Sequence, residues 1–137
     1  MKNNMKEIYI DVSIFIQAVL RDEKSCRQIL SRIVNNEIKV ITSVLSWDEL
    51  VYIIRKFTNK DIAIVEGEKF LRFPNLTFIS AKKEVINEAQ QLVEKYNLQP
   101  RDAIHAATAL INGCTEIISD DSDFDKVKGL KRIGIIN

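Results

Sequence analysis

Five acidic residues have the types and positions that could carry out chemistry, although they are scattered over the chain. They are Asp11, Glu49, Asp102, Asp121 and Asp123. Asp11, Glu49 and the pair Asp121 and Asp123 each come after a different apolar, strand-like run, and Asp102 lies at the start of a long apolar helix pattern. Carboxylates gathered on one rim repel each other unless a cation neutralises them. Hard oxygen ligands of this kind suit Mg²⁺ or Mn²⁺, which activate water and stabilise the charge that develops on a phosphodiester during in-line attack.

Each of these acids also has an ordinary structural explanation. Asp11 could cap the helix that follows it, and Glu49 and Asp102 could be first-turn acids favoured by the helix dipole. The Asp120–Asp123 run could be a polar turn. The combination of all of them, each at an expected strand end or helix start, is what favours a metal site.

The elements that must position these acids follow from hydrophobic periodicity. Strands are expected at 8–10, 38–41, 76–79, 116–119 and 132–136. Helices are expected at 12–20, 25–34, 61–71, 82–96 and 100–113. One more helix is expected to end near 57 and to be capped at its N-terminus by Thr42 or Ser43. Alternating short strands and helices predict an α/β domain with a central, mostly parallel sheet covered on both faces. Ligands bind outside the carboxyl ends of such strands, where these acids fall.

Composition narrows the function further. The chain has 137 residues, which predicts a single domain over 1–137 with residues 1–6 as a short N-terminal tail. Its net charge of +1 gives no global attraction to nucleic acid, so a polyanion would need a local patch. Two cysteines and one histidine do not make a disulfide framework or a Cys/His zinc site. The two scattered cysteines indicate a reducing compartment and hence a cytoplasmic protein, and the N-terminal pattern fits neither a signal peptide nor a membrane span.

Four segments in order resemble the motifs of PIN-domain nucleases: Tyr9–Ile16, Ser43–Leu50, Arg101–Ala109 and Ile118–Phe124. The resemblance implies a three-layer α/β/α fold and a metal-dependent ribonuclease that uses Mg²⁺ or Mn²⁺. It matches Asp11, Glu49, Asp102 and Asp121 to the family's catalytic, metal-binding acids, Asp123 to a further metal-binding acid, and Ser13 and Ser119 to positions that orient ligands or water. Asp121 is preferred over Asp120 because Asp121 and Asp123 then match the last two acids.

A stand-alone domain of this length is most similar to VapC-type toxins, which implies an RNA substrate, a small antitoxin partner and a homodimer, with no membrane association. Alternatives are a nuclease-inactive PIN-like module that binds RNA or protein, a housekeeping RNA-processing nuclease and, last, a phosphoryl-transfer domain. His105 lies three residues after Asp102 and could serve as a proton carrier or ligand, but it is interpreted as a packing residue or as one that supports the site residues from behind, and it is left out of the site. Arg101 is the basic residue best placed to meet a phosphate.

Overall fold

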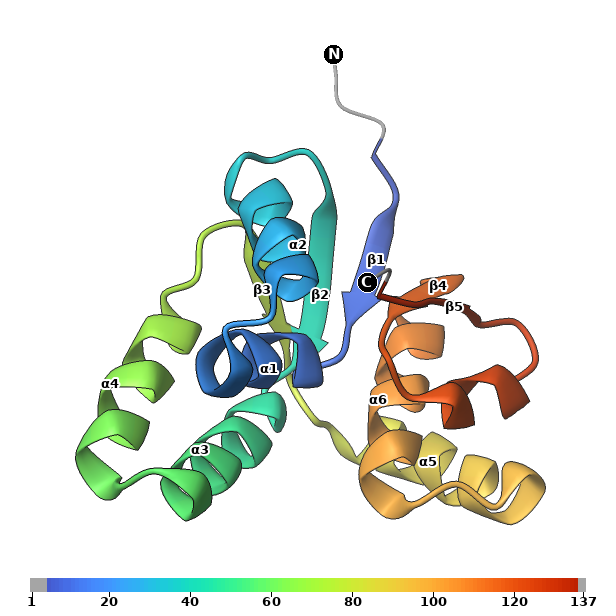
Figure 1. Cartoon of the computed structure of the whole chain (residues 1–137). Coiled ribbons are helices and arrows are strands. Elements are labelled where there is room, and N and C mark those ends of the chain that lie inside the picture. Colours follow the sequence, from blue (N-terminus) through green and yellow to red (C-terminus); the bar gives the residue numbers. More distant parts are fainter. Residues whose placement is uncertain (1–4, 136–137) are drawn as a thin grey trace.

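The computed structural model describes residues 5–135, and a parallel sheet forms its centre (Figure 1). In the described part of the chain the sheet has five strands in the order β3-β2-β1-β4-β5, and every pairing is parallel. The strands are β1 (Glu7–Ile10), β2 (Lys39–Ser43), β3 (Leu76–Ile79), β4 (Glu116–Ile118) and β5 (Lys131–Ile133). The sequence predicted a last strand over 132–136, but residue 136 lies outside the described range.

Helices cover both faces of this sheet, as expected. They are α1 (Ser13–Arg21), α2 (Lys24–Val34), α3 (Ser46–Phe57), α4 (Lys60–Leu71), α5 (Lys83–Tyr96) and α6 (Pro100–Ile111), with a 3₁₀ turn, η1 (Ser122–Lys126), before β5. Figure 1 shows α1 to α4 on one side of the sheet and α5 and α6 on the other. The predicted three-layer α/β/α arrangement is therefore confirmed.

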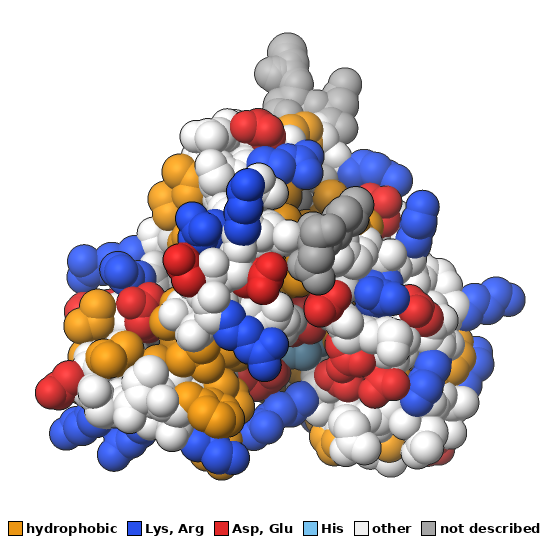
Figure 2. Space-filling view, in the orientation of Figure 1, with side chains coloured by type: hydrophobic (Ala, Val, Ile, Leu, Met, Phe, Trp, Pro, Cys, Tyr) orange, Lys and Arg blue, Asp and Glu red, His pale blue; other side chains and the backbone are white. Residues whose placement is uncertain are grey.

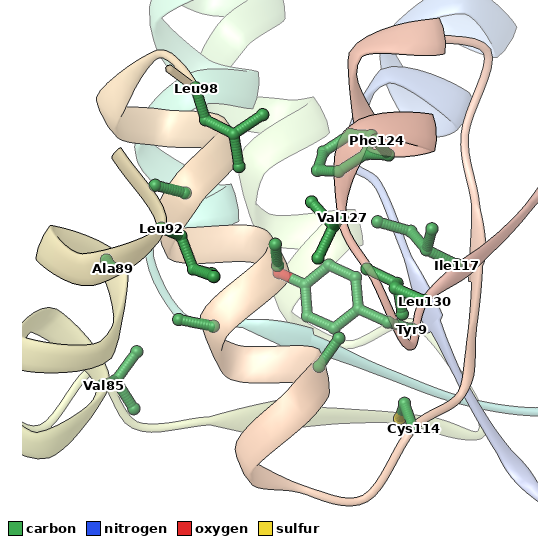
Figure 3. Close-up of a cluster of buried hydrophobic side chains, with 14 of the residues drawn as sticks. Tyr9, Val85, Ala89, Leu92, Leu98, Cys114, Ile117, Phe124, Val127 and Leu130 are labelled. Atoms are coloured by element: carbon green, nitrogen blue, oxygen red, sulfur yellow. The ribbon is translucent and has the colours of Figure 1, made fainter. Parts of the chain in front are cut away.

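Two hydrophobic clusters hold the layers together because successive strand residues point to opposite faces. Tyr9 packs in the cluster under α5 and α6, whereas its neighbour Ile10 packs in the cluster under α1 to α4. Ile117 and Ile118 divide in the same way between the two faces. Figure 3 shows the first cluster, with the Tyr9 ring at its centre. The central strands are therefore buried on both sides, which fixes their register.

The chain reverses its direction of travel across the sheet between β1 and β4. The first three strands step from β1 to β2 to β3, and β4 and β5 are then added on the other side of β1. In open α/β sheets, ligands bind outside the carboxyl ends of the strands at such a switch point. Asp11 directly follows β1 and its N–H donates to the Ile118 carbonyl of β4 at 2.9 Å. The fold thus places Asp11 at the switch point.

Local signals define the two helices that carry the other acids. Pro100 occupies the first turn of α6, and Gly113 with φ 78° follows its last turn, as the sequence predicted. The expected cap of α3 by Thr42 or Ser43 is wrong. The extended backbone continues through Ser43 and α3 begins at Ser46, so Ser43 Oγ instead accepts from the Leu45 N–H at 3.1 Å.

Candidate metal centre

Asp11 is held rigidly at the floor of the site. Its side chain is buried, with 7% of the residue exposed. Ser119 Oγ donates to Asp11 Oδ2 at 2.7 Å, and the Ser13 N–H donates to Oδ1 at 3.2 Å. Ser13 Oγ is also buried and, among the described residues, has no hydrogen-bond partner. Both predicted supporting serines therefore lie at Asp11, one of them with an unused hydroxyl group.

Three further acids bring their carboxylates together beside it. Asp102 in the first turn of α6, Asp121 and Asp123 each offer an oxygen, and these oxygens lie within 4.8 Å of one another. The turn after β4 shapes this group, because Ser119 Oγ accepts from the Asp121 N–H at 3.0 Å and Asp121 Oδ1 accepts from the Asp123 N–H at 2.9 Å. The serine that orients Asp11 thus also orients Asp121.

Crowding of like charges shows in the titration of Asp102. Burial, followed by the charges of Asp121 and Asp11, raises its pKa from 3.8 to about 6. His105 acts in the opposite direction but does not cancel these effects. At neutral pH, Asp102 is ionised only at a cost in free energy, which a bound cation would offset.

Glu49 reaches the site from the start of α3 and contacts the one histidine of the chain. His105 Nε2 lies 2.6 Å from Glu49 Oε1, and its other ring nitrogen, Nδ1, lies 2.5 Å from the Tyr9 hydroxyl. Burial opposes the charged imidazolium, but Tyr9, Glu49 and Asp11 together raise the pKa of His105 above its usual value. His105, interpreted from sequence as a packing or supporting residue outside the site, is therefore hydrogen-bonded to a predicted metal ligand.

One open pocket of about 320 Å³ joins the four predicted catalytic acids. Its lining comprises Asp11, Ser13, Gln17, Glu49, Asp102, Asp120 and Asp121. Asp123 adjoins it through its grouping with Asp102 and Asp121. Asp120 also lines the pocket, whereas of this pair only Asp121 belongs to the carboxylate group of Asp102, Asp121 and Asp123. Figure 2 shows acidic side chains on both sides of the hollow where the pale-blue histidine is visible.

The residues present fit a hard divalent cation. Every acid in the group offers carboxylate oxygens, the donor type that Mg²⁺ and Mn²⁺ prefer. The buried and unpartnered Ser13 Oγ provides a polar atom in the pocket lining that a metal-bound water could satisfy. Arg101 lines a neighbouring hollow of about 580 Å³ together with Glu49 and Asp102. It thus lies beside two of the acids.

Sequence reasoning missed Tyr9, Gln17 and the contact between His105 and Glu49. The position of His105 three residues after Asp102 placed both on one side of a helix, which was the available signal. Gln17 lies on α1 and lines the pocket. Tyr9 gave no signal, because an aromatic residue in a buried strand is typical of a core.

The sequence of this chain is similar to that of known proteins. A family model described as PIN domain matches residues 8–130. Ribonuclease VapC6 of Methanocaldococcus jannaschii is 25% identical over 141 residues, which covers 88% of this chain and 92% of that protein. Between residues 5 and 135, no helix is long and apolar enough to cross a membrane.

Two solved structures have the same fold. One chain of DNA-bound VapBC from Salmonella typhimurium has a TM-score of 0.76 with 14% identity, covering 97% of this chain and 100% of that one. A toxin-antitoxin complex from Klebsiella pneumoniae has a TM-score of 0.65 with 19% identity, covering 90% and 94%.

Proposed function

Because the chain belongs to the PIN domain family, we propose that it is a Mg²⁺- or Mn²⁺-dependent endoribonuclease and the toxin of a VapBC-type toxin–antitoxin pair. The observation that carries this proposal is the gathering of Asp11, Glu49, Asp102 and Asp121 around one pocket at the switch point of the sheet. Similarity to Ribonuclease VapC6 supports the same activity.

Each acid has a defined part in this proposal. Asp11, Glu49, Asp102 and Asp121 hold one or two divalent ions, and Asp123 assists Asp102 and Asp121. A bound ion supplies an activated water and stabilises the charge on the phosphodiester and on the departing 3′ oxygen. Ser119 fixes the orientation of Asp11 through its 2.7 Å hydrogen bond, and Ser13 Oγ holds a water in the pocket. Arg101 contacts a phosphate of the RNA.

The proposed partner is a small antitoxin protein, which the toxin-antitoxin complexes among the structural relatives support. A basic side chain of the antitoxin would complement the acidic pocket and block access of metal or RNA. We also propose a homodimer, supported by exposed Trp47, Tyr52 and Phe57 on α3. Cys26 and Cys114 are buried and neither forms a disulfide, which is consistent with a location in the reducing cytoplasm.

The test is cleavage of a panel of single-stranded and structured RNAs by wild type and Asp11→Asn, with Mg²⁺, Mn²⁺ or EDTA. Metal-dependent cleavage that Asp11→Asn lacks is the expected result. Asp61→Asn is the matched control, because Asp61 is an exposed acid in the first turn of α4, remote from the pocket lining. Equal cleavage by Asp11→Asn and wild type would refute the assignment of the pocket.

The second candidate is a PIN-like module that binds RNA or protein without cleavage. It predicts RNA binding that is indifferent to metal and to Asp11→Asn. The grouping of Asp102, Asp121 and Asp123 within 4.8 Å argues against it, since a binding module gains nothing from crowded carboxylates.

A further inference from the structure

A chain of hydrogen bonds runs from the sheet to Glu49 behind the acidic pocket. The Ser43 N–H donates to the Tyr9 hydroxyl oxygen at 3.0 Å, Tyr9 lies 2.5 Å from His105 Nδ1, and His105 Nε2 lies 2.6 Å from Glu49 Oε1. Tyr9 is fully buried and His105 is 2% exposed. Figure 3 shows the Tyr9 hydroxyl within the hydrophobic cluster, directed toward α6. The chain therefore links β2, β1 and α6 in series to the Glu49 carboxylate on α3.

The direction of the last bond in this chain is fixed by chemistry. An ionised carboxylate can only accept hydrogen bonds, so His105 Nε2 must carry the proton that it shares with Glu49. The Tyr9 hydroxyl then donates to Nδ1 of a neutral ring or accepts from a charged one. In both states the imidazole is held at its two nitrogens, and it donates to Glu49.

Glu49 depends on a distant partner for its orientation, unlike Asp121. Asp11 is oriented by Ser119, which follows the neighbouring strand β4, and by the Ser13 N–H at the start of α1, and Asp121 is oriented by the Asp123 N–H. Glu49 has a longer side chain that is 22% exposed, and a free side chain of this type samples several rotamers. The bond from His105 engages one carboxylate oxygen and leaves the other for a cation.

We infer that His105, braced by Tyr9, is a positioning residue that orients the Glu49 carboxylate for metal binding. This inference rests on the proposed function, because it assumes that Glu49 is a ligand. The alternative is a purely structural role, in which the same bonds only satisfy buried polar groups. The two differ in one respect: a structural role affects stability alone, whereas a positioning role also affects the metal affinity of the folded protein.

The experiment measures Mn²⁺ affinity of the full chain by calorimetry, under conditions where urea curves show each variant to be folded. Tyr9→Phe removes only the hydroxyl group, and His105→Leu removes the donor to Glu49. We expect His105→Leu to weaken Mn²⁺ binding by about 10-fold or more and Tyr9→Phe to weaken it by a smaller factor. His105→Gln should recover most of the affinity, because its amide nitrogen can donate to Glu49 in place of Nε2.

Tyr96→Phe is the matched control for Tyr9→Phe. The Tyr96 hydroxyl also accepts a backbone N–H, from Lys128 at 3.3 Å, but it lies outside the pocket lining. Its loss should leave Mn²⁺ affinity unchanged. If Tyr9→Phe and His105→Leu lower stability yet bind Mn²⁺ as tightly as wild type does, the positioning role is overturned.

A nuclear magnetic resonance readout keeps the inference testable if His105→Leu does not fold. The chain contains a single histidine, so its ring N–H signal needs no assignment by mutation. Adding Mg²⁺ should shift this signal in wild type and leave it unmoved in Glu49→Gln. A signal that Mg²⁺ does not move in wild type, although the ion binds, would overturn the inference.

The failure of the proposed function is separately visible. If wild type does not bind Mn²⁺, or if Glu49→Gln binds it equally well, the metal site itself is wrong and the positioning role falls with it. If wild type binds and Glu49→Gln does not, an unaffected His105→Leu overturns only the positioning role.

Discussion

Replacing Asp102 with asparagine should make the metal-free protein more stable at neutral pH while it weakens metal binding. Asp102 is ionised beside Asp121 and Asp123, whose oxygens lie within 4.8 Å of its own. Asparagine has nearly the same shape but carries no charge, so it removes the repulsion and the cost of burying a carboxylate. The sign of the change is therefore opposite to that of most substitutions at a functional site.

The magnitude follows from the pKa of Asp102, which is raised from 3.8 to about 6. At 1.36 kcal/mol per pKa unit, this difference corresponds to about 3 kcal/mol of destabilisation at pH 7.5. Solvent screens a half-exposed group, which reduces the figure to about 1–2 kcal/mol. Asparagine also loses the favourable interaction of a negative charge with the start of α6, about 0.3–1 kcal/mol. The expected net gain is about 1 kcal/mol.

Urea unfolding in EDTA, followed by the fluorescence of Trp47, measures this gain for wild type and Asp102→Asn. Between about pH 4 and 6 the folded wild type binds more protons than the unfolded chain, so its stability falls as pH rises through this range. The Asp102→Asn variant has no carboxyl group to titrate at this position, so its stability does not fall for this reason as pH rises. The gain of the variant should therefore be complete at pH 7.5 and should shrink as pH falls toward 4.

Asp61→Asn provides the comparison, because it also removes a first-turn helix acid but from an exposed position. It should leave stability within about 0.5 kcal/mol of wild type at both pH values. A variant Asp102→Asn that is no more stable than Asp61→Asn at pH 7.5 would refute the reasoning. Mg²⁺ at 100 times its Kd should stabilise wild type by about 2.7 kcal/mol and the Asp102→Asn variant by less.

Three further changes test the supporting structure. Ser119→Ala leaves the buried Asp11 Oδ2 without its 2.7 Å donor, so urea unfolding should show a loss of about 1–3 kcal/mol and calorimetry a lower Mn²⁺ affinity. Asn59→Ala removes the cap of α4, in which Asn59 Oδ1 accepts from the Ile62 N–H at 2.9 Å; thermal unfolding should show a cost of about 0.5–2 kcal/mol that Asn59→Ser largely avoids. Asn75→Gly tolerates φ 64° but loses two hydrogen bonds to the last carbonyls of α2, so urea unfolding should show a loss of about 1 kcal/mol or more.

Local patterns in the sequence predicted most of the strands and helices. The strand at 76–79 has the predicted bounds, and α6 begins at Pro100 as expected. These succeed because hydrophobic periodicity and proline geometry act over a few residues. The cap of α3 was wrong because Val44 extends the β-structure by donating to the Ile79 carbonyl at 3.0 Å, a contact between distant segments. A tertiary hydrogen bond therefore overrode a local preference.

In the candidate site too, local sequence patterns predicted some features, whereas others depend on contacts between distant residues. The acids could be found because each follows a strand or opens a helix, and the fold rule for parallel sheets brings those positions to one edge. The contact of His105 with Glu49 spans 56 residues, and that with Tyr9 spans 96. It depends on how α6 packs over β1 and β2, which no local pattern specifies. The assignment of catalytic roles to these residues stays a prediction.

The position of β1 in the middle of the sheet also determines when the acidic site can be completed during synthesis of the chain. β1 and β2, with Asp11 and Glu49, leave the ribosome first, whereas β4 and its turn, with Ser119 and Asp121, follow about a hundred residues after β1. Pairing across such a separation is slow, because the chain must close a long loop before any contact rewards it. A chain that ends before α6 lacks Ser119, which orients Asp11, and three of the five acids of the proposed site, Asp102, Asp121 and Asp123. We therefore expect the proposed nuclease to have no complete acidic site until its last third has been translated.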